Sequence, residues 1–249
     1  MMNLFTPLEQ FELTVLIPLY FLGFDFSITT MTFYLFFVCF FVIIFLFFGT
    51  YKALLVPRLL QSLVEFIYKF IYSMIMQQAG IGGKQYFAIF FTTFLFILFS
   101  NILGLMPYGF TTTSHLMITL SMAFTFNFGF ILLGFYLHGL GFLKLFVPSG
   151  APKALLPLIV VIEIASYLIR TISLSVRLFA NMLAGHTLLF IMASFVMAFL
   201  YSSYAFLGLL PFVIILAVYV LELGIAFIQA YVFIILVTIY LNDSLHPGH

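Results

Sequence analysis

The sequence predicts an all-α membrane protein with about five membrane-embedded helices and one amphipathic helix in the plane of the interface. Hydrophobic residues make up 65% of the 249 residues and charged residues 6%, whereas a soluble domain carries roughly 25% charged residues. Long apolar runs replace the alternating segments, of about ten residues each, that a membrane β-barrel requires. Because helices satisfy their own backbone hydrogen bonds in lipid, we expect one membrane domain over residues 1–249. The net charge of +1 gives no positive field for nucleic acid.

The chain opens with an acidic segment, residues 1–30, and a first spanning run. This segment contains Glu9, Glu12 and Asp25 but no Lys or Arg, whereas signal and transit peptides are basic. We therefore expect it to belong to the mature chain, the alternative being a short removed leader ahead of Thr6. Residues 31–51 follow as an apolar run of about the twenty residues that a bilayer core requires.

Residues 54–80 differ from the first span because polar side chains recur along one side of an otherwise apolar run. These side chains belong to Arg58, Gln61, Ser62, Glu65 and Lys69. They fall three or four positions apart, which places them on one stripe of a helix. An amphipathic helix with one polar stripe is typical of the membrane interface, where it lies parallel to the bilayer. We therefore do not count it as a span.

Two pairs of apolar segments complete the chain. Residues 86–106 and 116–137 have the ordinary length of a span, whereas 154–200 and 211–242 are much longer. A helix of about 32 residues is about 48 Å long, against a hydrocarbon core of about 30 Å. We expect the two long helices to tilt strongly or curve, and to form an antiparallel hairpin.

The basic residues outside the spans indicate the orientation of the chain. With the spans drawn as above, one face of the membrane receives all of them: Lys52, Arg58, Lys69, Lys84, Lys144 and Lys153. Positive charge marks the cytoplasmic or matrix side. The acidic N-terminus is therefore expected on the opposite side, and the C-terminus on the basic side.

The first long helix carries charged residues at membrane depth. Glu163, Arg170 and Arg177 recur every seven residues, which places them within about 40° of one another on one face. Asn181 extends this face by one turn. An arginine near a bilayer centre costs about 2.5 to 3.5 kcal/mol, so it usually faces protein or water and pairs with a carboxylate.

The second long helix carries a matching polar stripe of Glu222, Gln229 and Asp243. An antiparallel hairpin would bring Glu163 and Asp243 together near the basic side. It would bring His186 and Glu222 together near the other side, with Arg177 and Gln229 between the two pairs. His186 follows Arg177 by nine residues, almost the opposite face of the helix, unless it faces the second helix or Gly185 distorts the turn.

This arrangement predicts a proton path that is interrupted in the middle. Carboxyl groups and histidine pass protons, but arginine does not release its own. Arg177 would therefore block the path, and a carboxylate of another protein would have to carry the proton past it.

Each polar residue also has a structural interpretation. Arg177 forms a structural ion pair with Glu163 or Glu222 in this alternative, and His186 is a hydrogen-bonded packing residue. Arg170 lies near the basic boundary, where its side chain can extend toward the interface, and we favour a structural role for it. Asn101 either lines an access funnel with His115 or caps its helix.

Several runs of the sequence form recognisable motifs. The two most specific are RLFANMLAGH from Arg177 to His186 and ELGIAFIQAYVF from Glu222 to Phe233. Further motifs are SNILGLMPY at 100–108, FVP at 146–148 and YLNDS at 240–244. Together these runs resemble one known family, subunit a of the rotary F-type ATP synthase. The resemblance extends over essentially the whole chain, although the absence of Trp is unusual for the family.

The resemblance implies a stationary subunit that lies against a ring of c subunits and provides two offset aqueous half-channels. Arg177 matches the arginine that faces the c-ring carboxylate and prevents leakage between the half-channels, and Gln229 matches a glutamine near it. His186 and Glu222 match the inlet pair. Glu163 and Asp243 match the outlet toward the matrix.

The resemblance also implies partners and a location. The partners would be the c-ring, the peripheral stalk, other membrane-sector subunits and the lipid bilayer. Histidine on the first long helix and glutamate on the second is similar to the mitochondrial form, as is the start TPLEQFE at residues 6–12. The location would be the mitochondrial inner membrane, with the N-terminus on the intermembrane side and the C-terminus on the matrix side.

We expect neither enzymatic activity, cofactor nor metal in this chain. No Gly-rich phosphate-binding motif with its lysine is present, so nucleotide chemistry would belong to partner subunits. A single cysteine, Cys39, excludes an internal disulfide and a thiolate metal cluster. The competing classes are a secondary transporter, for which inverted repeats and interrupted helices are expected but not seen, and a passive scaffold whose buried ions pair with one another.

Overall fold

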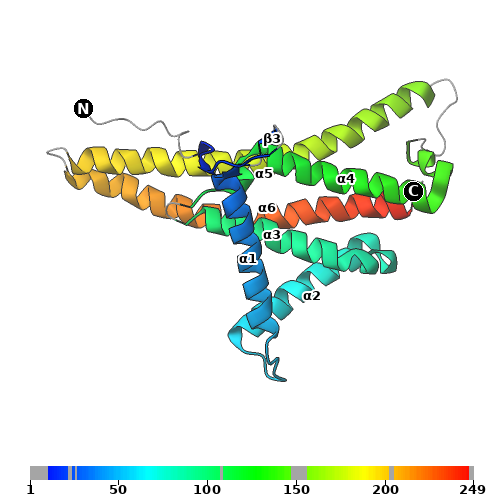
Figure 1. Ribbon diagram of the computed structural model, residues 1–249, viewed down its shortest axis with the longest axis horizontal. Coiled ribbons are helices and arrows are strands. Elements are labelled where there is room, and N and C mark those ends of the chain that lie inside the picture. Colours follow the sequence, from blue (N-terminus) through cyan, green and yellow to red (C-terminus); the bar gives the residue numbers. More distant parts are fainter. Residues whose placement is uncertain are drawn as a thin grey trace. The chain divides into compact units, whose positions relative to one another are not determined.

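The computed structural model describes residues 11–21, 24–25, 27–106, 109–146, 156–201 and 205–246. Six long helices follow one another along the chain (Figure 1): α1 Thr30–Thr50, α2 Leu59–Ala79, α3 Phe87–Gly104, α4 Leu116–His138, α5 Leu156–Leu200 and α6 Leu209–Leu245. Within the described residues, and with η2 counted as part of the third, six helices are long and apolar enough to cross a membrane. The predicted all-helical class is confirmed, and α5 and α6 are the longest helices, with 45 and 37 residues.

Short 3-10 helices join several of these elements: η2 Ile81–Tyr86, η3 Thr112–Ser114, η4 Gly139–Phe146 and η5 Ala205–Gly208. Helix α2 begins at Leu59, five residues later than predicted, because Pro57 disfavours helical geometry at the residue before it. Helix α2 is also long and apolar enough to cross a membrane, so its place in the interface stays a prediction.

The acidic N-terminal segment contains short strands that were not predicted from the sequence. Strand β1, Val15–Ile17, pairs antiparallel with β4, Ile28–Thr29, and β2, Tyr20–Phe21, pairs with β3, Phe24–Asp25. The backbone N–H of Thr30 donates to the carbonyl of Thr14 over 2.9 Å. This bond ties the strands to the first turn of α1. Residues 1–10, with Glu9, lie outside the described residues.

The chain forms two compact units. The first contains Met1–Ile44, Phe96–His115 and Leu178–Ala230, and the second contains Phe45–Leu95, Leu116–Arg177 and Tyr231–His249. Helices α5 and α6 therefore contribute to both. The expectation of a single domain over residues 1–249 stays a prediction.

Each unit has its own buried core. Fully buried apolar residues of the first unit include Leu178, Met182 and Ala226, where α5 packs on α6. Figure 1 shows the yellow part of α5 beside the orange start of α6 in this unit. The second unit buries aromatic side chains, among them Phe90 and Phe233. Close packing of this kind holds polar groups in fixed positions.

Candidate functional site

In the first unit an amide pair joins the two long helices. The Asn181 Nδ2 of α5 donates to the Gln229 Oε1 of α6 over 3.0 Å. Gln229 is only 3% exposed, and its Nε2 has no hydrogen-bond partner among the described residues. The pair sets the register of the two helices and leaves one buried donor available to a further group.

A second contact between these helices places a carboxyl group against a glycine. Glu222 is 4% exposed, and a Cβ atom added to Gly185 would overlap its carboxylate. Helix α5 continues unbroken through Gly185, so the glycine does not distort the turn. Its absent side chain instead makes room for Glu222, whose Oε2 has no hydrogen-bond partner among the described residues.

His186, the next residue, lies at a cavity of about 660 Å³. Other lining residues come from the N-terminal segment, α1 and the end of α3, among them Glu12, Thr30, Tyr34 and Met106. The ring of Phe11 contacts the His186 ring edge-on, with 6.5 Å between centroids. His186 Nε2 is buried and has no hydrogen-bond partner among the described residues. The lining is mostly apolar with a few polar groups, and a cavity of this size is large enough for several water molecules.

Glu12 was missed as a site residue. In the sequence it only argued against a targeting peptide, and no spacing relates it to His186. The structure places its exposed side chain on the same cavity, beside Phe11, whose ring contacts His186 of α5. Only tertiary structure carries this information.

Asn101 connects elements one turn before Leu105, which lines the cavity and whose backbone N–H donates to the Asn101 carbonyl over 3.2 Å. It is fully buried, accepts from Thr113 Oγ1 over 2.8 Å and donates from Nδ2 to the Ala226 carbonyl over 3.4 Å. These bonds reach η3 and α6, so the side chain does not cap α3. Its place beside an access funnel stays a prediction. A buried amide group requires hydrogen-bond partners, and Thr113 and Ala226 supply them here.

His115, the predicted companion of Asn101, lies just outside the spanning helices. Its ring stacks on Phe110, with 5.1 Å between centroids, and Phe110 lines the cavity. Burial disfavours the charged imidazolium and lowers the pKa of His115. This histidine therefore lies one aromatic ring away from the cavity that His186 reaches.

In the second unit α5 and α6 carry an ion pair. Arg170 Nη1 lies 3.8 Å from Asp243 Oδ2, and the two side chains are 39% and 29% exposed. Among the described residues of this unit it is the sole ion pair. The ion-pair partner of Asp243 is therefore Arg170. Glu163 is half-buried two turns before Arg170 on α5, and its expected place beside Asp243 stays a prediction.

Arg177 is exposed at the end of the second unit's portion of α5. It forms no ion pair with Glu163 or with any other described carboxylate of this unit. Polar contacts from α4 fix the rotation of α5: Asn127 Nδ2 donates to Thr171 Oγ1 over 2.6 Å, and Ser175 Oγ donates to Thr119 Oγ1 over 3.1 Å. The guanidinium is thereby kept outside the buried face of α5.

The two units hold different sets of titratable and charged groups. In the first, the carboxyl of Glu222 and the imidazole of His186 are groups that bind and release protons. In the second, the carboxyl groups of Glu163 and Asp243 accompany Arg170 and Arg177, which are permanent charges that do not release protons. Such a combination can accept protons at one place and refuse their passage at another.

Comparison with known proteins agrees with this chemistry. A family model described as ATP synthase A chain matches residues 31–242. The chain is similar to ATP synthase subunit a of Acanthamoeba castellanii, with 47% identity over 247 residues that cover 99% of this chain and 100% of that protein. It is similar to ATP synthase subunit a of Chelativorans sp., with 46% identity and 98% of each chain covered. It is also similar to that of Rhizobium meliloti, with 47% identity over 97% of this chain and 98% of the relative.

These matches extend over both units and over the polar residues of α5 and α6. The family model ends one residue before Asp243, and the full-length relatives continue past it. The family suggested by the sequence motifs is confirmed. The chain belongs to the ATP synthase A chain family.

Proposed function

We propose that the chain conducts protons as the stationary membrane subunit of a rotary ATP synthase in the mitochondrial inner membrane, where it works against a ring of c subunits. As a member of the ATP synthase A chain family it is a non-catalytic, multi-pass membrane subunit of ATP synthase. Moving one charge through 100 mV yields about 2.3 kcal/mol, so several protons must be coupled to each ATP.

The observation that carries the proposal is the cavity of about 660 Å³ that reaches His186. It adjoins a helix pair that buries the carboxyl of Glu222 without a partner for Oε2 among the described residues. Water in the cavity would deliver protons to the imidazole and the carboxyl. We assign His186 and Glu222 to the inlet half-channel, with Glu12 as a carboxylate at its cavity.

Arg177 is the barrier in this proposal. It is exposed, and no described carboxylate of its own unit pairs with it. A permanent charge in a spanning helix is costly unless it faces a partner or water. A c-subunit carboxylate is such a partner, and it would release its proton when it reaches the arginine. Asn181 and Gln229 are hydrogen-bonded to each other. We assign this pair to hold α5 and α6 together for the proton transfer to and from the c-subunit carboxylate.

Glu163 and Asp243 are assigned to the outlet half-channel. Both lie on the second unit's portions of α5 and α6, and neither is fully buried. Asn101 is assigned a supporting role, because its bonds to Thr113 and Ala226 hold α6 beside η3. The c-ring, the peripheral stalk and the other membrane-sector subunits are the proposed partners.

The mitochondrial location rests on residue order. Histidine precedes glutamate along the chain, at 186 and 222, which is similar to the mitochondrial form. Over nearly the whole chain, the Acanthamoeba castellanii relative and the bacterial relatives of Bartonella bacilliformis and Rhizobium meliloti have nearly equal identities, 47%, 44% and 47%, so identity does not distinguish the two locations. With the basic loops in the matrix, the N-terminus would face the intermembrane space.

The test is Arg177→Ala in the assembled complex, with ATP synthesis and ATP-driven proton pumping both measured. We expect both activities to be lost while assembly, checked on native gels, is unchanged. Arg170→Ala is the matched control, because it removes an arginine about two turns earlier on the same helix. This variant should retain measurable coupled activity. Coupled synthesis in the Arg177→Ala complex would contradict the proposal and favour a structural ion pair.

A further inference from the structure

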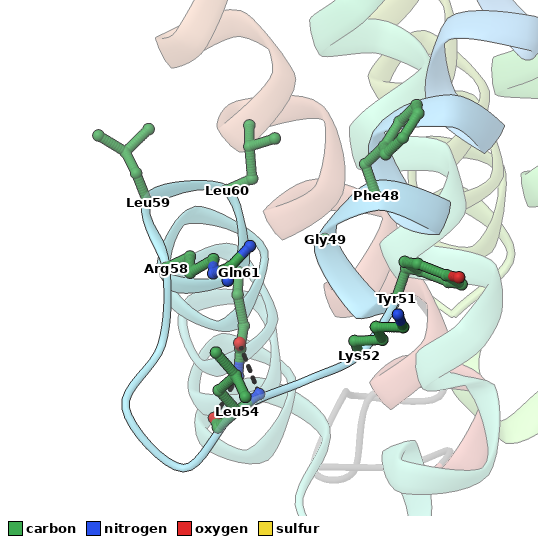
Figure 2. A pocket seen from close by; sticks show the side chains of 9 residues that line it. All are labelled: Phe48, Gly49, Tyr51, Lys52, Leu54, Arg58, Leu59, Leu60 and Gln61. Carbon is green, nitrogen blue, oxygen red and sulfur yellow. Dashed lines mark hydrogen bonds between the residues drawn. The ribbon is translucent and has the colours of Figure 1, made fainter.

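A second cavity, of about 620 Å³, lies in the second unit where α1 ends and α2 begins. Figure 2 shows the nine residues that line it, all between Phe48 and Gln61. It therefore belongs to a single loop and its two flanking helix ends. None of the residues assigned to the proton path lines this cavity, so the cavity is separate from the proposed half-channels.

Two cations lie at this cavity without an acidic partner. Lys52 and Arg58 both line it, and neither forms an ion pair with a described residue. Lys52 Nζ lies 5.5 Å from the centre of the Tyr51 ring. The nearby carboxylate of Glu65 instead accepts a hydrogen bond from Gln61 Nε2 over 2.8 Å. The cavity thus presents two positive charges that a bound anion can neutralise.

The walls of the cavity are preformed. Gln61 closes the loop with two bonds to Leu54: its Oε1 accepts from the backbone N–H over 3.1 Å, and its Nε2 donates to the carbonyl over 2.9 Å (Figure 2). A Cβ atom on Gly49 would overlap Val64, so α1 and α2 are in close contact there. A preformed site loses little entropy when a ligand binds.

The rim of the cavity is apolar and exposed. Its exposed apolar side chains are Phe48, Tyr51, Leu54, Leu59 and Leu60. They adjoin the end of α1, an apolar helix of spanning length. Aromatic rings at a helix end are typical of the level of the lipid headgroups. Cations beside exposed apolar side chains at that level match a ligand with a negative head and acyl chains.

We propose that this cavity binds the headgroup of an anionic phospholipid of the surrounding bilayer. The phosphate would lie between Lys52 and Arg58, and the acyl chains would lie along the exposed leucines. Basic pockets beside membrane helices on the matrix or cytoplasmic side bind anionic lipids in this way, and Lys52 and Arg58 both belong to the predicted basic face. A soluble phosphate would gain nothing from the apolar rim.

The experiment uses the whole ATP synthase complex, purified and delipidated in detergent. Phosphatidylglycerol or phosphatidylcholine is titrated in, and lipid bound to the complex is counted by native mass spectrometry. The variant is Lys52→Gln with Arg58→Gln. The matched control is Lys69→Gln with Lys84→Gln, which removes two exposed cations of the same unit that do not line the cavity.

We expect the variant to bind phosphatidylglycerol about twenty-five-fold more weakly, because each of the two cations near the membrane surface contributes about fivefold. Binding of phosphatidylcholine should not change, and the control should behave as the wild type. A charge-conserving variant, Lys52→Arg with Arg58→Lys, should retain binding, which separates charge from damage to the loop.

Three results would overturn the proposal. One is equal binding of phosphatidylglycerol by variant and wild type. Another is full competition by soluble glycerol 3-phosphate, which would indicate a site for free phosphate compounds. The third is the loss of a neighbouring subunit from the variant complex, which would make the cavity a protein contact.

Discussion

Two carboxyl groups of α6, Glu222 in the first unit and Asp243 in the second, have contrasting surroundings. Glu222 is 4% exposed and its Oε2 has no hydrogen-bond partner among the described residues. Asp243 is 29% exposed and lies 3.8 Å from the guanidinium of Arg170. Helix α6 therefore carries one buried carboxyl group, Glu222, with no ion pair to a described residue. It carries a second carboxyl group, Asp243, that is paired with a cation.

The difference separates two uses of a carboxyl group in a membrane. A carboxylate next to an arginine is stabilised in its charged form, because an opposite charge within about 4 Å favours ionisation. A buried carboxyl group without such a partner gains no comparable stabilisation. It is free to exchange a proton with water in an adjoining cavity. Mutations that change one surrounding at a time test whether the neighbours set the role of each group.

The largest effect is expected for Glu222→Gln. Glutamine has nearly the same size, so packing against Gly185 is retained while the proton-binding group is lost. A positioned proton-transfer group typically contributes roughly a hundredfold or more, and we expect ATP-driven proton pumping to fall by about that factor. The measurement is the initial pumping rate in membranes with matched amounts of assembled complex. A rate within about threefold of wild type would give Glu222 no more than a structural role.

An intermediate effect is expected for Gly185→Ala. The added Cβ atom overlaps the carboxylate of Glu222, so the side chain must move away from its present position. A displacement of about 1 Å at a reacting group can cost about a hundredfold; because a glutamate side chain is flexible, we expect a smaller loss of pumping, about tenfold.

The matched test for this contact is the double variant Gly185→Ala with Glu222→Asp. Aspartate is one methylene shorter, which makes room for the alanine, so the double variant should pump faster than Gly185→Ala alone. Equal or lower activity in the double variant would mean that the glycine serves helix packing in general and has no specific relation to Glu222.

The helices and the residues of the long hairpin could be predicted from sequence because they depend on local pattern. The lengths of α5 and α6 follow from apolar runs, and the seven-residue spacing of Glu163, Arg170 and Arg177 places them on one face. The motifs around Arg177 and Glu222 then indicated the family, which the comparisons confirmed.

The contacts that complete the site depend on tertiary structure. Glu12 lies at the cavity beside Phe11, whose ring contacts His186 of α5, and no sequence pattern relates residues so far apart. The side-chain partners of Asn101, Thr113 and Ala226, are likewise 12 and 125 residues away along the chain. Gly185 did leave a signal, since a glycine inside a helix costs about 1 kcal/mol relative to alanine and usually has a packing reason.

The smallest effect is expected at the Arg170–Asp243 pair. Partly exposed ion pairs contribute about 1 kcal/mol or less, but removal of one partner leaves the other charge uncompensated in a spanning helix. Asp243→Asn alone should therefore lower the thermal stability of the complex by a few degrees. Arg170→Gln with Asp243→Asn should restore most of it, because no unpaired charge remains.

Pumping measured on the same variants separates the structural use of Asp243 from its proposed place in the outlet half-channel. If Asp243 only neutralises Arg170, the double variant regains pumping together with stability. If it also passes protons, stability returns while pumping stays low, because asparagine cannot bind and release a proton. Strictly additive losses of stability would contradict the pair itself, since residues in direct contact couple by about 0.5 kcal/mol or more. The contrast with Glu222 would then rest on burial alone and no longer on the neighbouring cation.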